Sequence, residues 1–477
     1  MPNFLHGVET IRIPIGQRQV LLVKSAVSAL VGAAPVGPVD TPVLVNSDTA
    51  AAQFGPRLPG FGIAAALDAN FDQGRPHAGV VIVVNVLDPA RHKTAVADES
   101  LAFDPATDRA SLAHPGVANP VIKSEDGATT HALDVDYALD PVTGGATRMA
   151  GGGIARGATV KASYDYADPA LVTAADIIGA VDASGKRTGL QALLDCYGLF
   201  GFFPKRIIAP TYCTLASVST EMIALASRIR ARAYIDAPLG LTFAEVLAGR
   251  GPGGAINFNT GSERARLCWP HVARRDPATG ERLFEPLSQY VAGVGNAVDM
   301  AEGYWVSPSN HEIQGITGLE RPVHAMINDP NSEANLLNEA GITTVFNNFG
   351  TGFLVWGNRT AAYPSRSDME TFENVLATHD IIDESIEYFS LQLIDGPVTE
   401  AGIDHVLEKV SALQRKLRAD GALVNGKCWY SPDDNDPTEL AAGHVTFRRD
   451  RLAPPPMERI TYKVGVNLEY FQRIGQN

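Results

Sequence analysis

The chain has 477 residues, 45% of them hydrophobic and 19% charged, a composition typical of a globular protein and not of a disordered chain. Lys and Arg number 39 against 53 Asp and Glu, and the resulting net charge of −14 argues against nucleic acid as a partner. Four widely spaced cysteines without a CxxC pair argue against a disulfide scaffold or a zinc ribbon. We find no signal-peptide pattern and no run of about 18 apolar residues, so we expect no membrane insertion by this chain.

The first 24 residues predict an extended N-terminal arm, because Ile11, Ile13 and Ile15 alternate with polar residues as they do on one side of a strand. Residues 25–91 combine apolar strand patterns with one helical pattern. The run GVVIVVNVLD within them is typical of a buried parallel strand. The same alternation of strands and helices resumes over 171–324. We therefore predict an α/β multidomain protein whose doubly wound core is built from both stretches.

Between these two stretches, residues 92–170 show a different sequence pattern. Turn signals such as DPATDRA, LDPVTGG and MAGGGIARG separate short alternating segments such as HALDVDYAL and ATVKASYDY. This pattern predicts a small antiparallel β domain inserted into the α/β core.

Residues 325–453 predict a separate C-terminal α+β domain. Its clearest helix, TEAGIDHVLEKVSALQRKLRADG, places apolar residues on one stripe and is stopped by Gly421. A triproline spacer then leads into a C-terminal arm, residues 454–477, that alternates strictly. Such a strand cannot satisfy its own backbone hydrogen bonds, so it is either an edge strand of its own domain or a strand donated to a neighbouring subunit.

Three motifs come close to nucleotide or metal signatures and fail. A GxGxxG at 249–254 follows a helix and not a strand, and we interpret it as a loop. The stretch GAVDASGKRTG has Ala180 and Arg187 where a phosphate loop needs Gly and Ser or Thr. His311-Glu312 lacks the second histidine of a zincin, since residue 315 is Gly. We therefore predict no catalytic residues, no metal and no cofactor.

One block of the sequence is specific for a family. GITTVFNNFGTGFLVWGNRTAAYP, preceded by NSEANLLNEA and followed by DIIDESIEYFSLQLIDGPVT, closely resembles the C-terminal domain of contractile phage tail sheath proteins. FLHGVETIRI, VGAAPVGPVDTPVLVNSDTAAAQFG and APPPMERITYKVGVNLEYF are also similar to sheath segments. The resemblance covers most of the chain except the inserted β domain.

This resemblance implies a structural subunit, not an enzyme, that polymerises into stacked hexameric rings around a tail tube. Contraction of the sheath would drive the tube through the host envelope, with energy stored at assembly and no nucleotide hydrolysed. The implied partners are further copies of this chain, the tail tube protein, and the baseplate and tail terminator proteins. The implied location is the virion tail, after assembly in the host cytoplasm.

The resemblance also implies roles for individual residues. The residues expected to lie in intersubunit sheets through strand exchange are Ile11, Ile13, Ile460, Tyr462, Val464, Val466 and Leu468. A sheath box formed by Trp356, Gly357, Arg359 and Thr360 is either a core and hydrogen-bonding scaffold or an interface.

Two helices are candidates for the surface that meets the tube. The side chains expected to contact an acidic tube, or else to form an ordinary solvated helix face, are Lys409, Arg415, Lys416 and Arg418. The helix at 332–340 is a rival tube-facing candidate. In this picture the 325–453 domain is inner and the 92–170 domain faces outward.

Two alternatives stay open at this point. The sequence does not separate the sheath of a phage from that of a phage-derived bacteriocin. A secretion-type injection machine normally splits this function over two chains, so one self-contained chain favours the phage or bacteriocin tail. An enzyme resembling an α/β hydrolase belongs to another class and would require a cleft with convergent titratable residues.

Overall fold

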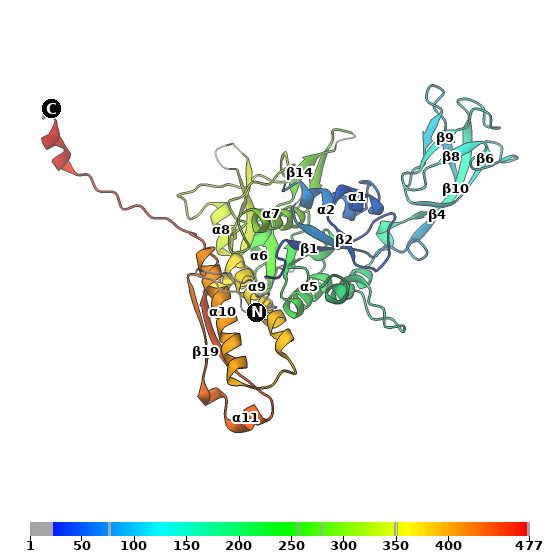
Figure 1. Cartoon of the computed structure of the whole chain (residues 1–477). Coiled ribbons are helices and arrows are strands. Elements are labelled where there is room, and N and C mark those ends of the chain that lie inside the picture. Colours follow the sequence, from blue (N-terminus) through cyan, green and yellow to red (C-terminus); the bar gives the residue numbers. More distant parts are fainter. Residues whose placement is uncertain are drawn as a thin grey trace, which may run out of the picture. The chain divides into compact units, whose positions relative to one another are not determined.

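The computed structural model describes residues 22–74, 78–254, 256, 258–276, 279–347, 350 and 352–474 (Figure 1). The chain forms two compact units. The large unit comprises residues 24–377 and 455–477, and the small unit comprises residues 378–454 with the residues up to Val23. The predicted N-terminal strand with Ile11 and Ile13 lies outside the described residues.

The large unit is built on an eight-stranded sheet whose six central strands are parallel, with one antiparallel strand at each edge. Long apolar runs such as Val80–Asn85 suit strands that are covered on both faces. The strands in spatial order are β18 (Phe353–Trp356), β17 (Ile342–Asn347), β13 (Ala265–Cys268), β12 (Arg232–Asp236), β11 (Arg206–Ile208), β1 (Val27–Gly32), β3 (Val80–Asn85) and β2 (Val43–Val45).

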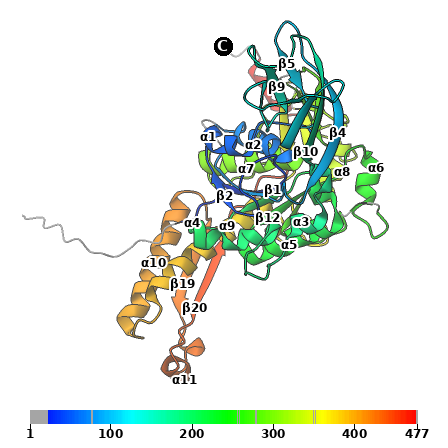
Figure 2. The ribbon, with the colours of Figure 1, turned by 90° about the vertical axis from the view of Figure 1, so that its right-hand side faces the viewer.

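Helices cover both faces of this sheet, so the α/β class predicted from the sequence is confirmed (Figure 2). In β1, Val27, Ala29 and Val31 point into the core under α5 (Ala216–Ile229), whereas Leu30 points into the core under α2 (Gly62–Phe71) and α7 (Leu287–Ala301). The shorter helical segments of this unit are α1 (Asp48–Ala51), η1 (Ala52–Phe54), η2 (Pro169–Leu171), α3 (Ala174–Ile178), η3 (Gly189–Asp195), α4 (Cys196–Phe200), η4 (Tyr212–Thr214), α6 (Phe243–Ala248), α8 (Glu333–Glu339) and η5 (Met369–Thr371).

Residues 93–167 form two antiparallel sheets around their own apolar core, which includes Leu101, Tyr137 and Tyr164. Lys93 pairs with Ala167, so the first and last residues of this stretch lie side by side. The strands are β4 (Lys93–Ala102), β5 (Arg109–Ser111), β6 (Val117–Ser124), β7 (Thr130–His131), β8 (Tyr137–Leu139), β9 (Gly145–Arg148) and β10 (Thr159–Ala167).

The structure places one boundary differently from the sequence prediction. A separate domain was expected to begin at residue 325, but β17 and β18 extend the eight-stranded sheet, and the compact division falls at Thr378. The division lies inside helix α9 (Glu373–Ser390). The reason is that β17 pairs with β13, so residues around 342–356 complete the core sheet. A small sheet in the large unit contains β14 (Val272–Arg275), β15 (Arg282–Glu285) and β16 (Gly318–Leu319).

The small unit packs helix α10 (Glu400–Ala419) against a two-stranded antiparallel sheet of β19 (Asn425–Tyr430) and β20 (Phe447–Leu452). The hydroxyl of Thr399 caps the helix by accepting from the Gly402 amide at 3.1 Å, and Gly421 ends it with a φ of 87°. Val410, Leu413 and Leu417 are buried, as the apolar stripe predicts. The unit also contains η6 (Leu391–Leu393), η7 (Pro432–Asp434) and α11 (Pro437–Ala441).

Candidate functional site

The sheath box begins where β18 leaves the edge of the large sheet. The Trp356 ring stacks on Phe346 with centroids 4.8 Å apart. With the Asn338 amide oriented to satisfy both of its ends, its oxygen accepts from Trp356 Nε1 at 3.1 Å and its nitrogen donates to the Ile342 carbonyl at 3.0 Å. The box tryptophan therefore ties the edge strand to the last turn of α8.

Gly357 occupies a position that other residues fill only with strain. Its φ is 128°, and a Cβ there would come within 2.6 Å of the Asn338 side chain and 3.1 Å of the Thr343 Cα. The Gly357 amide donates to Ser309 Oγ at 3.0 Å, and its carbonyl accepts from Arg266 Nη2 at 2.7 Å. This glycine thus connects the box directly to a buried arginine of the core sheet.

Arg359 and Thr360 are held by the segment that precedes α9. Arg359 donates from Nη1 to Thr371 Oγ1 at 2.6 Å, and its guanidinium lies 3.5 Å from the centre of the Phe372 ring. Thr360 is buried, and its amide donates to the Thr371 carbonyl at 2.8 Å. Arg359 also pairs with Glu458 at the root of the C-terminal arm. These contacts favour the scaffold alternative for the box.

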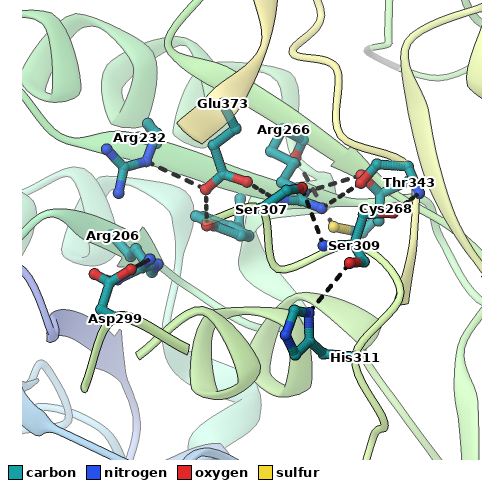
Figure 3. Close-up of polar contacts among 12 residues, drawn as sticks. Arg206, Arg232, Arg266, Cys268, Asp299, Ser307, Ser309, His311, Thr343 and Glu373 are labelled. Carbon is teal, nitrogen blue, oxygen red and sulfur yellow. Dashed lines mark hydrogen bonds and ion pairs between the residues drawn. The ribbon is translucent and has the colours of Figure 1, made fainter. Parts of the chain in front are cut away.

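Charged residues that the sequence analysis did not single out form a network in the core (Figure 3). Arg206, Arg232 and Arg266 lie on the neighbouring strands β11, β12 and β13 and are all buried. Glu373, the first residue of α9 and 3% exposed, lies between Arg232 and Arg266 and pairs with both. It also accepts a hydrogen bond from the Tyr234 hydroxyl. A single carboxylate is therefore shared by arginines of two adjacent strands.

The third arginine of this network has its own partner. Two nitrogens of Arg206 donate to the two Asp299 oxygens, each at 2.9 Å, and Nη1 also donates to Asn296 Oδ1 at 2.9 Å. Burial acts to lower the pKa of Arg206, but the Asp299 carboxylate and Tyr234 together outweigh it, and the pKa lies above its usual value. The sequence carried a signal for this network, because KRIIAP, RARAYID and ARLCW each place an arginine inside an apolar strand.

A buried carboxyl stands at the end of β12. Asp236 is 2% exposed, accepts from the Ser288 amide at 2.8 Å at the beginning of α7, and accepts from Cys213 Sγ at 3.4 Å. Burial raises the pKa of Asp236 from 3.8 to about 6. The folded chain therefore binds the proton of the Asp236 carboxyl more tightly than the unfolded chain does.

This shift predicts a pH-dependent effect of Asp236→Asn. The contribution of Asp236 to stability is fully present below pH 4 and is lost as the pH rises to about 6, by on the order of 3 kcal/mol. Asparagine keeps an acceptor for the Ser288 amide but does not titrate. We expect the variant to gain stability over the wild type between pH 4 and 6, measured by denaturant unfolding of both chains. A difference independent of pH would contradict the assignment.

The candidate tube-contact residues lie along α10. Arg415, Lys416 and Arg418 are exposed, Lys409 is half-buried, and Lys416 pairs with Asp420 at 2.9 Å. The acidic residues of this helix all precede its lysines and arginines, an order that also suits the helix dipole. The helix dipole thus explains the basic residues of α10 without a tube, and a contact with the tube stays the alternative explanation. The rival helix α8 is anchored through Ala334 and Leu337.

The C-terminal arm exposes its apolar side chains. Residues 453–467 have no regular secondary structure, and Tyr462, Val464 and Val466 are 82%, 90% and 90% exposed. The prediction of one continuous strand is wrong from Leu468 onwards, because Leu468–Arg473 form a 3₁₀ helix, η8. Without a neighbouring strand this short helix satisfies backbone groups locally, starting with Asn467 Oδ1, which accepts from the Glu469 amide at 2.9 Å.

In the part of the chain that the structure describes, no group of three or more His, Cys, Asp or Glu side chains is placed to hold a metal ion. None of the helices among the described residues is both long and apolar enough to cross a bilayer.

Known proteins resemble this chain in sequence over most of its length. The model of the phage tail sheath protein central domain matches residues 185–361, and that of the phage tail sheath C-terminal domain matches residues 366–467, together more than half of the chain. The tail sheath protein of Burkholderia phage BcepMu is 55% identical over 469 residues, which cover 98% of each chain. A putative prophage major tail sheath protein of Pseudomonas aeruginosa strain UCBPP-PA14 is 33% identical over 67% of this chain and 80% of its own.

Solved structures agree at the level of the fold. The contracted helical sheath of the anti-feeding prophage matches with a TM-score of 0.60 at 16% identity, over 98% of this chain and 100% of the other. The sheath complex of the extracellular contractile injection system PVC, also contracted, matches with a TM-score of 0.58 at 13% identity over the same shares. Fold and sequence together define a structural tail component of a contractile injection system. The chain belongs to the phage tail sheath protein family.

Proposed function

We propose that this chain polymerises into stacked hexameric rings around a tail tube and that contraction of the resulting sheath drives the tube through the host envelope. In this proposal the chain binds copies of itself, the tube protein, and the baseplate and tail terminator proteins. It performs no catalysis and requires no cofactor, nucleic acid or membrane insertion of its own. The same mechanics would serve a phage or a phage-derived bacteriocin.

The exposed C-terminal arm carries the proposal. Burying apolar surface stabilises a protein by roughly 25 cal/mol per Å², so a run of almost fully exposed Tyr462, Val464 and Val466 is unfavourable unless another surface covers it. Strand addition would cover these side chains and pair the backbone of the same residues. Ile460 extends the donated segment, and Leu468, the first residue of η8 in the unpaired chain, would join it on strand addition. Ile11 and Ile13 would supply the corresponding N-terminal strand.

The small unit offers acceptor edges for such strands. Its sheet of β19 and β20 has two strands, so among the described residues each strand has one edge without a partner. Open edges of this kind bind extended segments through main-chain hydrogen bonds. We propose that this unit lies on the inner side of the sheath, where Lys409, Arg415, Lys416 and Arg418 would face the tube, and that residues 92–170 face outward.

Negative-stain electron microscopy of the purified full-length chain over a concentration series tests the proposal. Hollow striated tubes, formed alone or after addition of the candidate tube protein, are the expected result. Compact particles at every concentration, with and without the tube protein, would contradict it.

A further inference from the structure

We propose that the ion pair between Arg359 and Glu458 is an anchor that fixes where the C-terminal arm leaves the large unit and so positions the arm for strand exchange. Arg359 Nε donates to Glu458 Oε1 at 2.9 Å and Nη2 donates to Oε2 at 2.7 Å, which is the two-pronged geometry of a strong guanidinium–carboxylate pair. This inference rests on the strand exchange proposed above and adds the residues that direct it.

The arginine side of the pair is held from several directions. The Arg359 side chain is 12% exposed, and its third nitrogen is bonded to Thr371. Its guanidinium lies 3.5 Å from the Phe372 ring centre and 4.6 Å from that of Tyr363. Two aromatic contacts and the hydrogen bond to Thr371 hold the guanidinium independently of the arm, so it forms a fixed point on the body of the protein.

On the glutamate side of the pair, the contacts of the chain with the body of the protein end abruptly. Ala453 is buried, the triproline spacer follows, and the Glu458 amide donates to the Pro456 carbonyl at 2.9 Å. Beyond Glu458, the described residues up to Ile474 make their hydrogen bonds within the arm itself. Glu458 is therefore the last described arm residue with an ion pair to the large unit.

This arrangement limits the reach of the donated segment. Leu468 lies ten positions beyond Glu458 in the chain, a span of roughly 33 Å when fully extended. An arm fixed at Glu458 searches a smaller volume than one fixed at Ala453, and a smaller volume raises the effective concentration of the strand near its acceptor. The anchor thus favours an acceptor edge within that distance of Arg359.

Limited trypsin digestion of dilute, unassembled protein tests the anchor directly. The bond after Arg459 adjoins the anchor, whereas the bond after Lys463 lies further out and serves as an internal control. Arg359→Lys keeps the charge and leaves the sequence around both bonds unchanged, but it cannot form the two-pronged pair. We expect cleavage after Arg459 to become roughly three- to tenfold faster, with cleavage after Lys463 unchanged.

A matched control uses Arg366, an exposed arginine of the same segment that pairs with Asp368 and Glu263. Arg366→Gln is expected to leave both cleavage rates at their wild-type values, and thermal unfolding checks that each variant folds. Unchanged cleavage after Arg459 in Arg359→Lys would overturn the anchor.

The second measurement connects the anchor with assembly. Glu458→Gln alters only an exposed side chain and is expected to raise the protein concentration at which tubes appear several-fold. Faster digestion of Arg359→Lys combined with an unchanged assembly onset of Glu458→Gln would overturn the positioning role. Failure of strand exchange itself has a different signature, namely that Val464→Pro assembles like the wild type. That outcome leaves the digestion of Arg359→Lys unaffected, because the digestion is measured on unassembled protein.

Discussion

Deletion of residues 457–477 is expected to leave a folded chain that no longer assembles. The deletion removes an arm whose apolar side chains are exposed, so little of either compact unit is lost. It also removes every residue proposed for C-terminal strand exchange. Circular dichroism and thermal unfolding should resemble those of the full chain, while electron microscopy and sedimentation should show no tubes. Long tubes formed by the truncated chain would refute strand donation.

Point substitutions at Val464 distinguish the contribution of backbone pairing to assembly from that of side-chain packing. Val464→Pro removes one ladder donor in the middle of the donated segment and should impair assembly without affecting folding. Val464→Thr is the matched control, since it keeps the amide and the β-branched shape. We expect the threonine variant to assemble far better than the proline variant. Equal assembly by both would point to side-chain packing and not to strand pairing.

Glu373→Gln is expected to destabilise the large unit by about 3–5 kcal/mol, because it removes a buried carboxylate that pairs with both Arg232 and Arg266 in the core. The exposed Glu408 on α10 supplies the control, and Glu408→Gln should change stability by less than about 0.5 kcal/mol.

The unfolding of each unit can be followed separately in this experiment. Cys196, Cys213 and Cys268 are buried in the large unit, whereas Cys428 is half-buried in the small unit. Thiol labelling in a denaturant series should show the three large-unit thiols reacting at lower denaturant in Glu373→Gln. Labelling that matches the wild type would show that Glu373 does not stabilise the sheet.

Local patterns predicted much of this fold. The apolar run at Val80–Asn85 indicated a buried parallel strand, and the stripe of Val410, Leu413 and Leu417 indicated a helix that ends before Gly421. Both features depend on residues close together in the chain, whose spacing determines which face is buried. The helix runs from Glu400 to Ala419, close to the predicted range.

Features that depend on distant residues were not predictable in the same way. The pairing of β17 with β13 joins segments about 75 residues apart, and no periodicity encodes it, so the boundary at 325 was misplaced. The sequence places Arg232 and Arg266 inside apolar strands, but it does not indicate that their shared partner is Glu373, more than a hundred residues away in the chain. The arm alternates in sequence, but alternation does not supply the partner that a strand requires.

The pairing of Lys93 with Ala167 has a consequence for engineering this chain. The His92 carbonyl accepts from the Asp168 amide at 2.9 Å, so the two ends of the β domain meet like the two sides of a hairpin. A polypeptide whose termini lie equally close together can replace residues 93–167 without stretching the chain that remains. This position is therefore a natural graft point for a cargo or binding domain on each subunit of the polymer.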